Sequence, residues 1–382
     1  MPTDPQTGKH VPLVGLIAVV VLVAAGAWYF FMYKPANPVG YYPQYLGDST
    51  VNKAIATENP TFAEGIELMR NGQGSAAVEK FRAALPNAKD PAQEGLIKLY
   101  TAITLNLIGG KENRAEGIAL LKEIAANEHY LRSERATAIE EMAQLYAYTN
   151  DGRVTKEVFK DRPYAAMFVS DDIQLSYRRL YEYAISIFPN AVSELRVANW
   201  YARKLAASAD AESPSLSDEQ AAQYKDIVRQ AVAAAHENVE LMSLNQPQYE
   251  ATIGQVKLWE AVVASNMRLA GDTSYEDPSK LYLESIDLFK VGNDAADGYA
   301  RFYYAWYLAN ASEGSARKVK EVLAPFYNTK AYQDSRVEKF FINLGGSGSY
   351  NQRILKQIAG IDSQFKSYLT SIGWTAEETS AN

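Results

Sequence analysis

Two serine–lysine pairs are the first candidates for catalysis, because their residue types and spacing could support a nucleophilic serine. Ser315 precedes Lys318 by three residues, and Ser363 precedes Lys366 by three. A Ser-x-x-Lys arrangement on a helix is the pattern of a serine nucleophile beside a lysine. The Lys-Thr-Gly segment that completes such a site is missing, and no stretch alternates like a β-strand that would carry it. We therefore interpret both pairs as chance matches.

The pair Glu284-Ser285 is the second candidate for catalysis. It resembles the Glu-Ser pair of lytic transglycosylases, some of which carry helical solenoids. The resemblance implies a cell-wall glycan-cleaving enzyme that uses Glu284. The Gly-Leu-Met-Gln type of segment expected downstream is absent, however, and Glu284 fits an exposed helical position. We keep glycan cleavage as an alternative and expect that the chain is not an enzyme.

The composition gives little support to metal, cofactor or nucleic-acid chemistry. The chain has no cysteine, and its histidines, His10, His129 and His236, lie far apart in the sequence. P-loop, G-x-S-x-G and H-E-x-x-H patterns are missing. The formal net charge is −7, whereas nucleic-acid binding needs clustered lysine and arginine. We expect no cofactor, no metal site and no nucleic-acid partner.

The N-terminal segment has the pattern of a membrane span. No charged residue occurs from Val11 to Tyr33, and as a helix this segment would span about 34 Å, enough for the hydrocarbon core. Aromatic residues at its far end, followed by Lys34, suit the membrane interface. We predict a transmembrane helix over residues 12–33, after a short tail at 1–11. Its membrane-anchor residues include Leu13, Leu16, Val20, Val23, Trp28, Tyr29 and Phe31.

Cleavage and orientation of this segment have alternatives. Ala25-Gly26-Ala27 resembles the cleavage site of a signal peptide, although the apolar run continues beyond it. Lys9 and Lys34 nearly balance across the span, so the charge rule for orientation decides little. The short basic tail and the lack of cysteine favour a cytoplasmic N-terminus. We expect a single-pass membrane protein whose soluble domain is extracytoplasmic, either periplasmic or extracellular.

The rest of the chain shows helical periodicity almost throughout. Apolar residues recur at spacings of three and four, as on one face of a helix. One such stripe contains Ile173, Tyr177, Leu180, Ala184 and Ile187. Start signals agree, because Ser217 and Gln220 form a capping-box pattern and Ser170 precedes two aspartates. We predict essentially no sheet.

One unit carries more than helical periodicity. Between Phe62 and Pro91, the residues Gly65, Ala77, Phe81 and Ala84 fall at the offsets of the tetratricopeptide repeat (TPR) signature. There a small residue lets the first helix approach its partner, and alanine with a large aromatic fills the groove. This stretch resembles a tetratricopeptide repeat. The resemblance implies a stack of helix pairs whose concave face holds peptides or partner proteins.

The predicted fold class is therefore all-α, a TPR-like helical-repeat solenoid preceded by a single transmembrane helix. A Pro- and Tyr-rich linker at 34–50 leads into TPR-like helical repeats at 51–208. A loop or inter-lobe linker at 209–217 precedes a second helical-repeat lobe at 218–373, and a flexible tail follows at 374–382.

Partner-binding residues are predicted from aromatic and arginine-rich helical stretches. Core packing explains most of the aromatic run 299–307, but tyrosine and arginine also serve well in interfaces. The predicted partner-binding residues are Arg70, Arg178, Tyr181, Arg301, Tyr303 and Tyr307. We expect a membrane-anchored scaffold for protein–protein interaction in a cell-envelope, secretion or surface-appendage complex, with other proteins or peptides as partners. The alternative is a self-assembling structural subunit of a membrane-associated homo-oligomer or filament.

Overall fold

The computed structural model describes residues 58–70, 72–149, 152–170, 172–210, 215–245, 250–292, 297–311, 315–329 and 349–374. Every regular element in these ranges is a helix, so the predicted all-α fold is confirmed for this part of the chain. No helix in these ranges is long and apolar enough to cross a membrane. The predicted transmembrane helix 12–33 with its anchor residues, the linker 34–50 and the tail from residue 375 lie outside the described residues. All described helices belong to one compact unit, residues 41–382.

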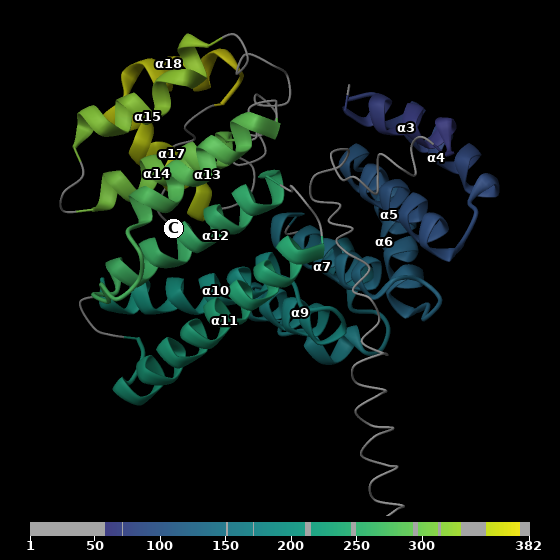
Figure 1. Ribbon diagram of the computed structural model, residues 1–382, viewed down its shortest axis with the longest axis horizontal. Coiled ribbons are helices and arrows are strands. Elements are labelled where there is room, and N and C mark those ends of the chain that lie inside the picture. The colour runs from purple at the N-terminus through teal and green to yellow at the C-terminus, as the bar shows by residue number, and fades with distance from the viewer. Residues whose placement is uncertain are drawn as a thin grey trace, which may run out of the picture. The chain divides into compact units, whose positions relative to one another are not determined.

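The helices follow one another along the chain in the order shown in Figure 1. The first group comprises α3 (Pro60–Arg70), α4 (Gly74–Ala84), α5 (Pro91–Ile108), α6 (Lys111–Ala126), α7 (Arg132–Thr149), α8 (Gly152–Val158) and α9 (Ile173–Ile187), with 3-10 turns η2 (Leu85–Asn87) and η3 (Tyr164–Met167). The second comprises α10 (Ala191–Ala209), α11 (Asp218–Asn245), α12 (Glu250–Leu269), α13 (Pro278–Gly292), α14 (Gly298–Asn310), α15 (Ala316–Asn328), α17 (Ser349–Ile361) and α18 (Ser363–Ser371).

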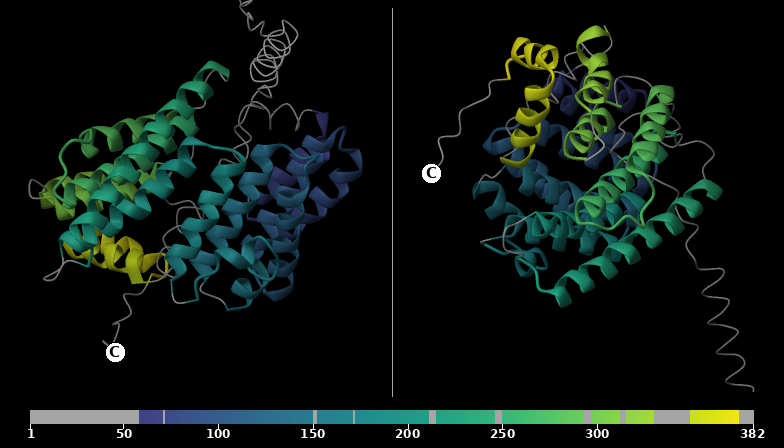
Figure 2. Two further views of the ribbon diagram at one scale, coloured as in Figure 1. Left: turned by 90° about the horizontal axis from the view of Figure 1, so that it is seen from below. Right: turned by 90° about the vertical axis from the view of Figure 1, so that its left-hand side faces the viewer.

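Helix packing follows the order of the chain. From α3 to α7, and again from α12 to α15, each helix packs on its neighbours in sequence (Figures 1 and 2). Helices two apart also touch, as α5 does with α7, α10 with α12, and α12 with α14. Contacts to the next helix and the next but one are typical of stacked helix pairs. The chain is therefore a helical repeat-like all-α protein.

The α3–α4 pair packs as its sequence predicts. Phe81 of α4 is fully buried, and its ring edge lies so near Gly65 that a Cβ there would be 2.5 Å from Phe81 Cε1. Phe62 and Tyr100 complete an aromatic cluster, with ring centroids 5.7 Å and 5.7 Å from that of Phe81. Gly65 is thus the position at which α3 can approach the aromatic ring of α4.

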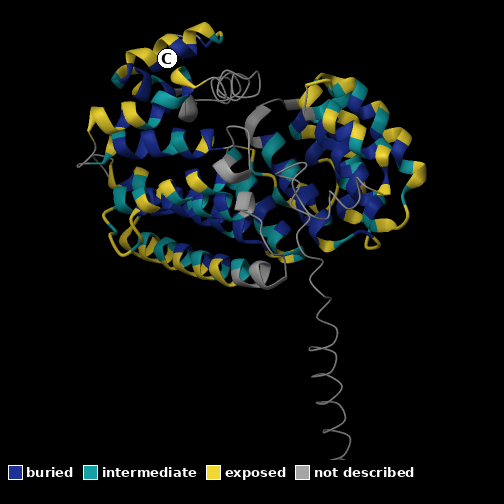
Figure 3. Ribbon diagram, turned by 45° about the horizontal axis from the view of Figure 1, so that its top comes forward, coloured by how far each residue is buried: buried dark blue, intermediate teal, exposed yellow. Residues whose placement is uncertain are grey.

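Two larger hydrophobic cores share α12 as a common wall. Buried residues, dark blue in Figure 3, occur throughout the described helices. Val256, Val263 and Met267 belong to the core that extends back to α5. Leu258, Ala261 and Val262 belong to the core that extends forward to α18. Because residues on opposite faces of one helix enter different cores, α12 needs apolar residues nearly all round.

Helix starts confirm the capping signals read from the sequence. Gln220 N–H donates to Ser217 Oγ at 3.2 Å, and Ser217 N–H donates to Gln220 Oε1 at 3.0 Å, which is a complete capping box. At the predicted start after Ser170, the cap is Asp172, whose Oδ1 accepts from Leu175 N–H at 2.8 Å. These side chains satisfy N–H groups that have no partner within the helix.

A glutamate lies in the packed interior between α5 and α7. Glu134 has no exposed surface, and its Oε2 accepts from Leu131 N–H at 3.2 Å. Its Oε1 is buried without a hydrogen-bond partner in the described structure. A Cβ at Gly95 would lie 2.3 Å from Glu134 Oε2, so the carboxyl occupies the space that this glycine leaves. Burial raises the pKa of Glu134 to about 9, against the opposing effect of the Leu131 hydrogen bond.

Candidate functional site

A cleft of about 570 Å³ opens where the two large cores meet. The helices around it pack in the order α10, α12, α14 and α17 (Figure 1). In this order α10 and α17 form the outer walls, and α12 and α14 form the floor. Its volume lies within the range of about 300–1,000 Å³ typical of ligand pockets.

Each of the four helices lines the cleft with one face, and the spacing of residues along the helix determines which side chains lie on that face. On α10 the lining residues Trp200, Arg203, Lys204 and Ala207 recur at helical spacings of three and four. The other helices supply pairs three or four residues apart. These pairs are Asn266 and Leu269, Trp306 and Asn310, and Arg353 and Gln357.

The cleft combines positive charge with aromatic and amide side chains. Arg203, Lys204 and Arg353 supply three cationic groups, and Asp210 supplies the one carboxylate of the lining. Trp200 of the α10 wall and Trp306 of the floor are both buried, at 8% and 7% exposure, so neither ring protrudes from the surface. An excess of lysine and arginine is notable in a chain whose net charge is −7.

Amide side chains hold the floor and the α17 wall in place. Gln357 Nε2 donates to Asn310 Oδ1 at 3.0 Å, and Asn310 Nδ2 donates to Trp306 O at 2.7 Å. The first bond ties α17 to α14, and the second holds the Asn310 side chain against its own helix. Arg353 lies one turn before Gln357 on α17. The position of Arg353 in the cleft therefore depends on this amide pair.

Asn266 presents a polar atom from a buried side chain. It is 3% exposed, and its Nδ2 donates to Asn199 Oδ1 at 3.1 Å and to Val262 O at 2.9 Å. Both amide hydrogens are thereby used. Oδ1 has no hydrogen-bond partner in the described part of the chain and is the acceptor that Asn266 offers to a ligand.

Arg178, one of the predicted partner-binding residues, lies directly behind the α10 wall. Its guanidinium carbon is 4.8 Å from the ring centroid of Trp200, and its Nη1 donates to Tyr201 Oη at 2.8 Å. Glu182 pairs with Arg178 Nε at 3.1 Å. Lys204 Nζ lies 5.3 Å from the centroid of the same indole, so two cations contact Trp200. Burial raises the pKa of Tyr201.

Tyr181 and Tyr303 belong to a continuous layer of arginine and aromatic rings. Tyr181 is fully buried and accepts a short hydrogen bond from Arg196 Nη1. The same guanidinium lies 5.1 Å from the ring centroid of Trp259, which lies 6.2 Å from that of Tyr303. Burial raises the pKa of Tyr181 well above its ordinary value. The layer joins α9, α10, α12 and α14, so these residues support the cleft from inside.

The remaining predicted partner-binding residues lie away from the cleft lining. Arg301 Nε pairs at 2.6 Å with Oδ2 of Asp297, the residue before α14, and the Arg301 side chain is 12% exposed. Tyr307 is buried, with its ring centroid 6.3 Å from that of Tyr282. Arg70 is the last residue of α3, and its side chain lies outside what the structure describes. Binding by these residues stays a prediction.

The residues first considered for catalysis have structural contacts. Glu284 lies between Lys257 Nζ at 3.5 Å and Lys280 Nζ at 3.7 Å. Ser285 is buried and donates to Gly254 O at 2.6 Å, which links α13 to α12. Ser315 Oγ accepts from Lys318 N–H at 3.2 Å and caps α15. The Ser-x-x-Lys spacing at Ser315 is thus the spacing of a helix cap.

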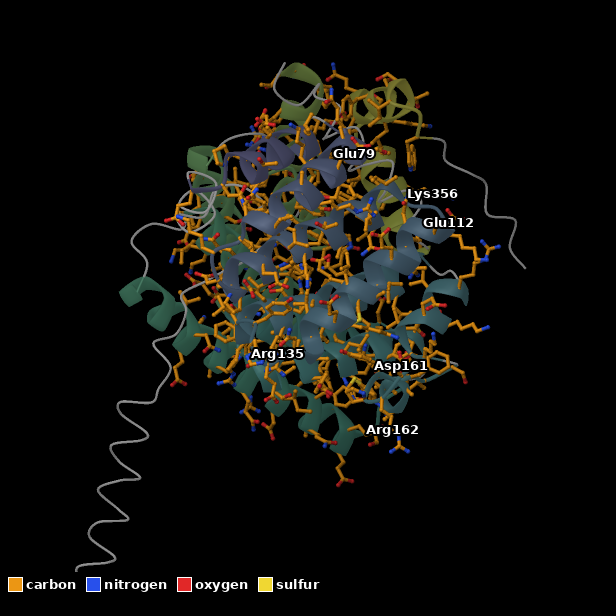
Figure 4. The ribbon with its side chains drawn as sticks, turned by 90° about the vertical axis from the view of Figure 1, so that its right-hand side faces the viewer. Glu79, Glu112, Arg135, Asp161, Arg162 and Lys356 are labelled. Atoms are coloured by element: carbon orange, nitrogen blue, oxygen red, sulfur yellow. The ribbon has the colours of Figure 1, made fainter. Side chains whose placement is uncertain are left out.

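A second cavity of about 330 Å³ lies between α6 and α8. Near it, Lys122 donates to the Glu157 carbonyl and pairs with Asp161 at 3.0 Å (Asp161 is labelled in Figure 4). The lining comprises Lys111, Arg114, Ala115, Ile118, Arg153, Val154, Lys156 and Glu157. This cavity is smaller than the cleft at α10 and α17, and its lining has no aromatic residue. We therefore take the cleft at α10 and α17 as the candidate site.

None of the residues that line the cleft was predicted from the sequence. The sequence does contain a pattern that could have indicated the α10 wall. A tryptophan followed three and four residues later by two cations lies on one helix face, as Trp200, Arg203 and Lys204 do. Arg353 and Gln357 form a weaker pattern, since their spacing is common on exposed helices. No protein-family model, no curated protein and no solved structure matches this chain.

Proposed function

We propose that this protein is a TPR-like helical-repeat scaffold that binds a segment of a partner protein in the cleft between α10 and α17. One observation carries the proposal: four helices bring tryptophan, arginine, lysine and amide groups together around one hollow. Tryptophan and arginine are the residues most enriched where protein interfaces gain their affinity. Concave surfaces of stacked helix pairs are a common place for such binding.

The α3–α4 pair supports the TPR-like part of this proposal. Its Gly65–Phe81 contact is the packing that the repeat signature describes. The N-terminal segment 12–33 would anchor the scaffold in a membrane, with the helical unit on the extracytoplasmic side. A cell-envelope, secretion or surface-appendage complex would then be the setting in which the partner is held.

Site-specific photocrosslinking in living cells tests the binding role. A benzophenone amino acid replaces Ala207, an exposed cleft residue, in the full-length chain. The control carries the same group at Glu79 (labelled in Figure 4), an exposed residue of α4 that is not part of the cleft lining. We expect one defined crosslinked product from position 207 and none of that mass from position 79.

The products separate the candidate functions. A product with a different protein supports the scaffold, whereas a product of twice the chain mass indicates self-assembly through this cleft. Equal labelling at both positions, or no product from position 207, would reject the cleft as a protein-binding site.

Alkaline extraction of the same membranes tests the anchor: the chain is expected to stay in the pellet, and release into the supernatant would contradict anchoring.

A further inference from the structure

We propose that the partner segment held in the cleft is acidic and extended, with its carboxylates between the α10 and α17 walls. This inference rests on the proposed function and adds the chemical class of the ligand. The alternatives are a neutral segment recognised by shape alone and a basic segment recognised by Asp210. The charges, the amide and the apolar residues of the lining all bear on the choice.

The distribution of charge favours carboxylates. Lys204 is exposed, and within the described residues no carboxylate lies at ion-pair distance from its ammonium. Its Nζ lies 5.3 Å from the ring centroid of Trp200, which places the charge beside the wall of the cleft. Arg353 brings a second cation from α17, the wall on the other side. A ligand that spans the cleft therefore meets positive charge at both walls, which attracts an acidic segment and repels a basic one.

The floor favours a peptide backbone. Asn266 Oδ1 is an acceptor on a side chain that is 3% exposed, and an amide N–H is its natural donor. A backbone N–H would satisfy it while the side chains of the ligand turn towards the walls. Leaving this acceptor without a partner after water is displaced would cost binding energy.

Apolar residues complete the lining. Leu269 and Ile354 provide aliphatic surface, and Ala206 and Ala207 are small lining residues of α10. An aliphatic side chain of the ligand would pack against Leu269 and Ile354. Alternation of side chains in an extended segment would turn carboxylates at successive positions towards the α10 wall and the α17 wall.

The test combines charge reversal with the crosslinker at position 207. A cleft variant carries Lys204→Glu and Arg353→Glu in the full-length chain. A matched control carries Lys318→Glu and Lys320→Glu, two exposed residues of α15 outside the cleft lining. Circular dichroism and thermal unfolding check that both variants keep the fold. We expect at least a tenfold loss of crosslinked product in the cleft variant and no loss in the control.

The captured segment is then sequenced by mass spectrometry after proteolysis. The peptide crosslinked to position 207 is expected to contain more Asp and Glu than Lys and Arg. Full crosslinking in the cleft variant, equal loss in both variants, or a neutral or basic captured peptide would each overturn the acidic ligand while leaving the scaffold proposal standing. Absence of any product from the parent chain at position 207 would instead overturn the scaffold proposal, and with it this inference.

Discussion

Glu134 provides the sharpest physical prediction, because its buried carboxyl links stability to pH. Its pKa rises from an ordinary 4.5 to about 9 in the folded chain, mainly because burial disfavours the charged form. Between these values the folded state keeps the proton and the unfolded state has lost it. The folded state therefore binds more protons, and the free energy of unfolding falls as pH rises through this window. The contribution of Glu134 to the free energy of unfolding is fully present below about pH 4.5, and it is lost progressively as the pH rises to about 9.

The magnitude follows from the same linkage. Within the window, each pH unit changes the free energy of unfolding by about 1.4 kcal/mol, so pH 6 to pH 8 corresponds to roughly 2.7 kcal/mol. Glu134→Gln removes the proton equilibrium but keeps an acceptor for Leu131 N–H. The new NH₂ group has no partner at the position of Oε1, which costs about 1–3 kcal/mol at every pH. The free energy of unfolding of the variant is therefore lowered by an amount that does not depend on pH. The contribution of Glu134 to the parent does depend on pH, so the difference between the two proteins changes with pH.

The assay is urea unfolding of the full-length parent and variant at pH 6, 7 and 8, followed by circular dichroism. The stability of Glu134→Gln relative to the parent is expected to improve by roughly 2–3 kcal/mol from pH 6 to pH 8. Glu79→Gln, on an exposed residue of α4, controls for the loss of one carboxyl at the surface and is expected to show no such trend. Parallel pH profiles for parent and Glu134→Gln would refute a protonated, buried Glu134.

Two further predictions compare matched pairs of sites. Gly65→Ala is expected to lower the free energy of unfolding by about 1–3 kcal/mol, because its Cβ would meet the Phe81 ring. Gly360→Ala, an exposed helical site with nothing within 4 Å of a new Cβ, is expected to raise it by up to about 1 kcal/mol; equal effects in thermal unfolding would contradict the close approach. Asn190→Ala removes a buried cap that also donates to a buried glutamate of α7, so we expect a loss of about 2–4 kcal/mol. Ser217→Ala removes an exposed cap and is expected to cost about 1 kcal/mol or less, and a larger loss for Ser217→Ala than for Asn190→Ala would count against the burial argument.

The sequence alone determined the helices, their caps and one helix-pair contact. These features depend on residues a few positions apart, because apolar spacing of three and four marks a helix face and a side chain caps the turn that follows it. Spacing along the chain was sufficient to predict the capping box of Ser217 and Gln220. It was also sufficient to predict the contact of Gly65 with Phe81 on the next helix.

Only the tertiary structure decided which helix faces meet. Trp200 and Arg353 come from distant parts of the chain, and their spacing says nothing about a shared cleft, because stacking angles between helices arise from packing along the whole unit. Burial was likewise decided by packing: Tyr181 and Glu134 lie inside, although in sequence both resemble residues of a solvated helix face. The period of a helix identifies its faces, and only the assembled helices determine what each face contacts.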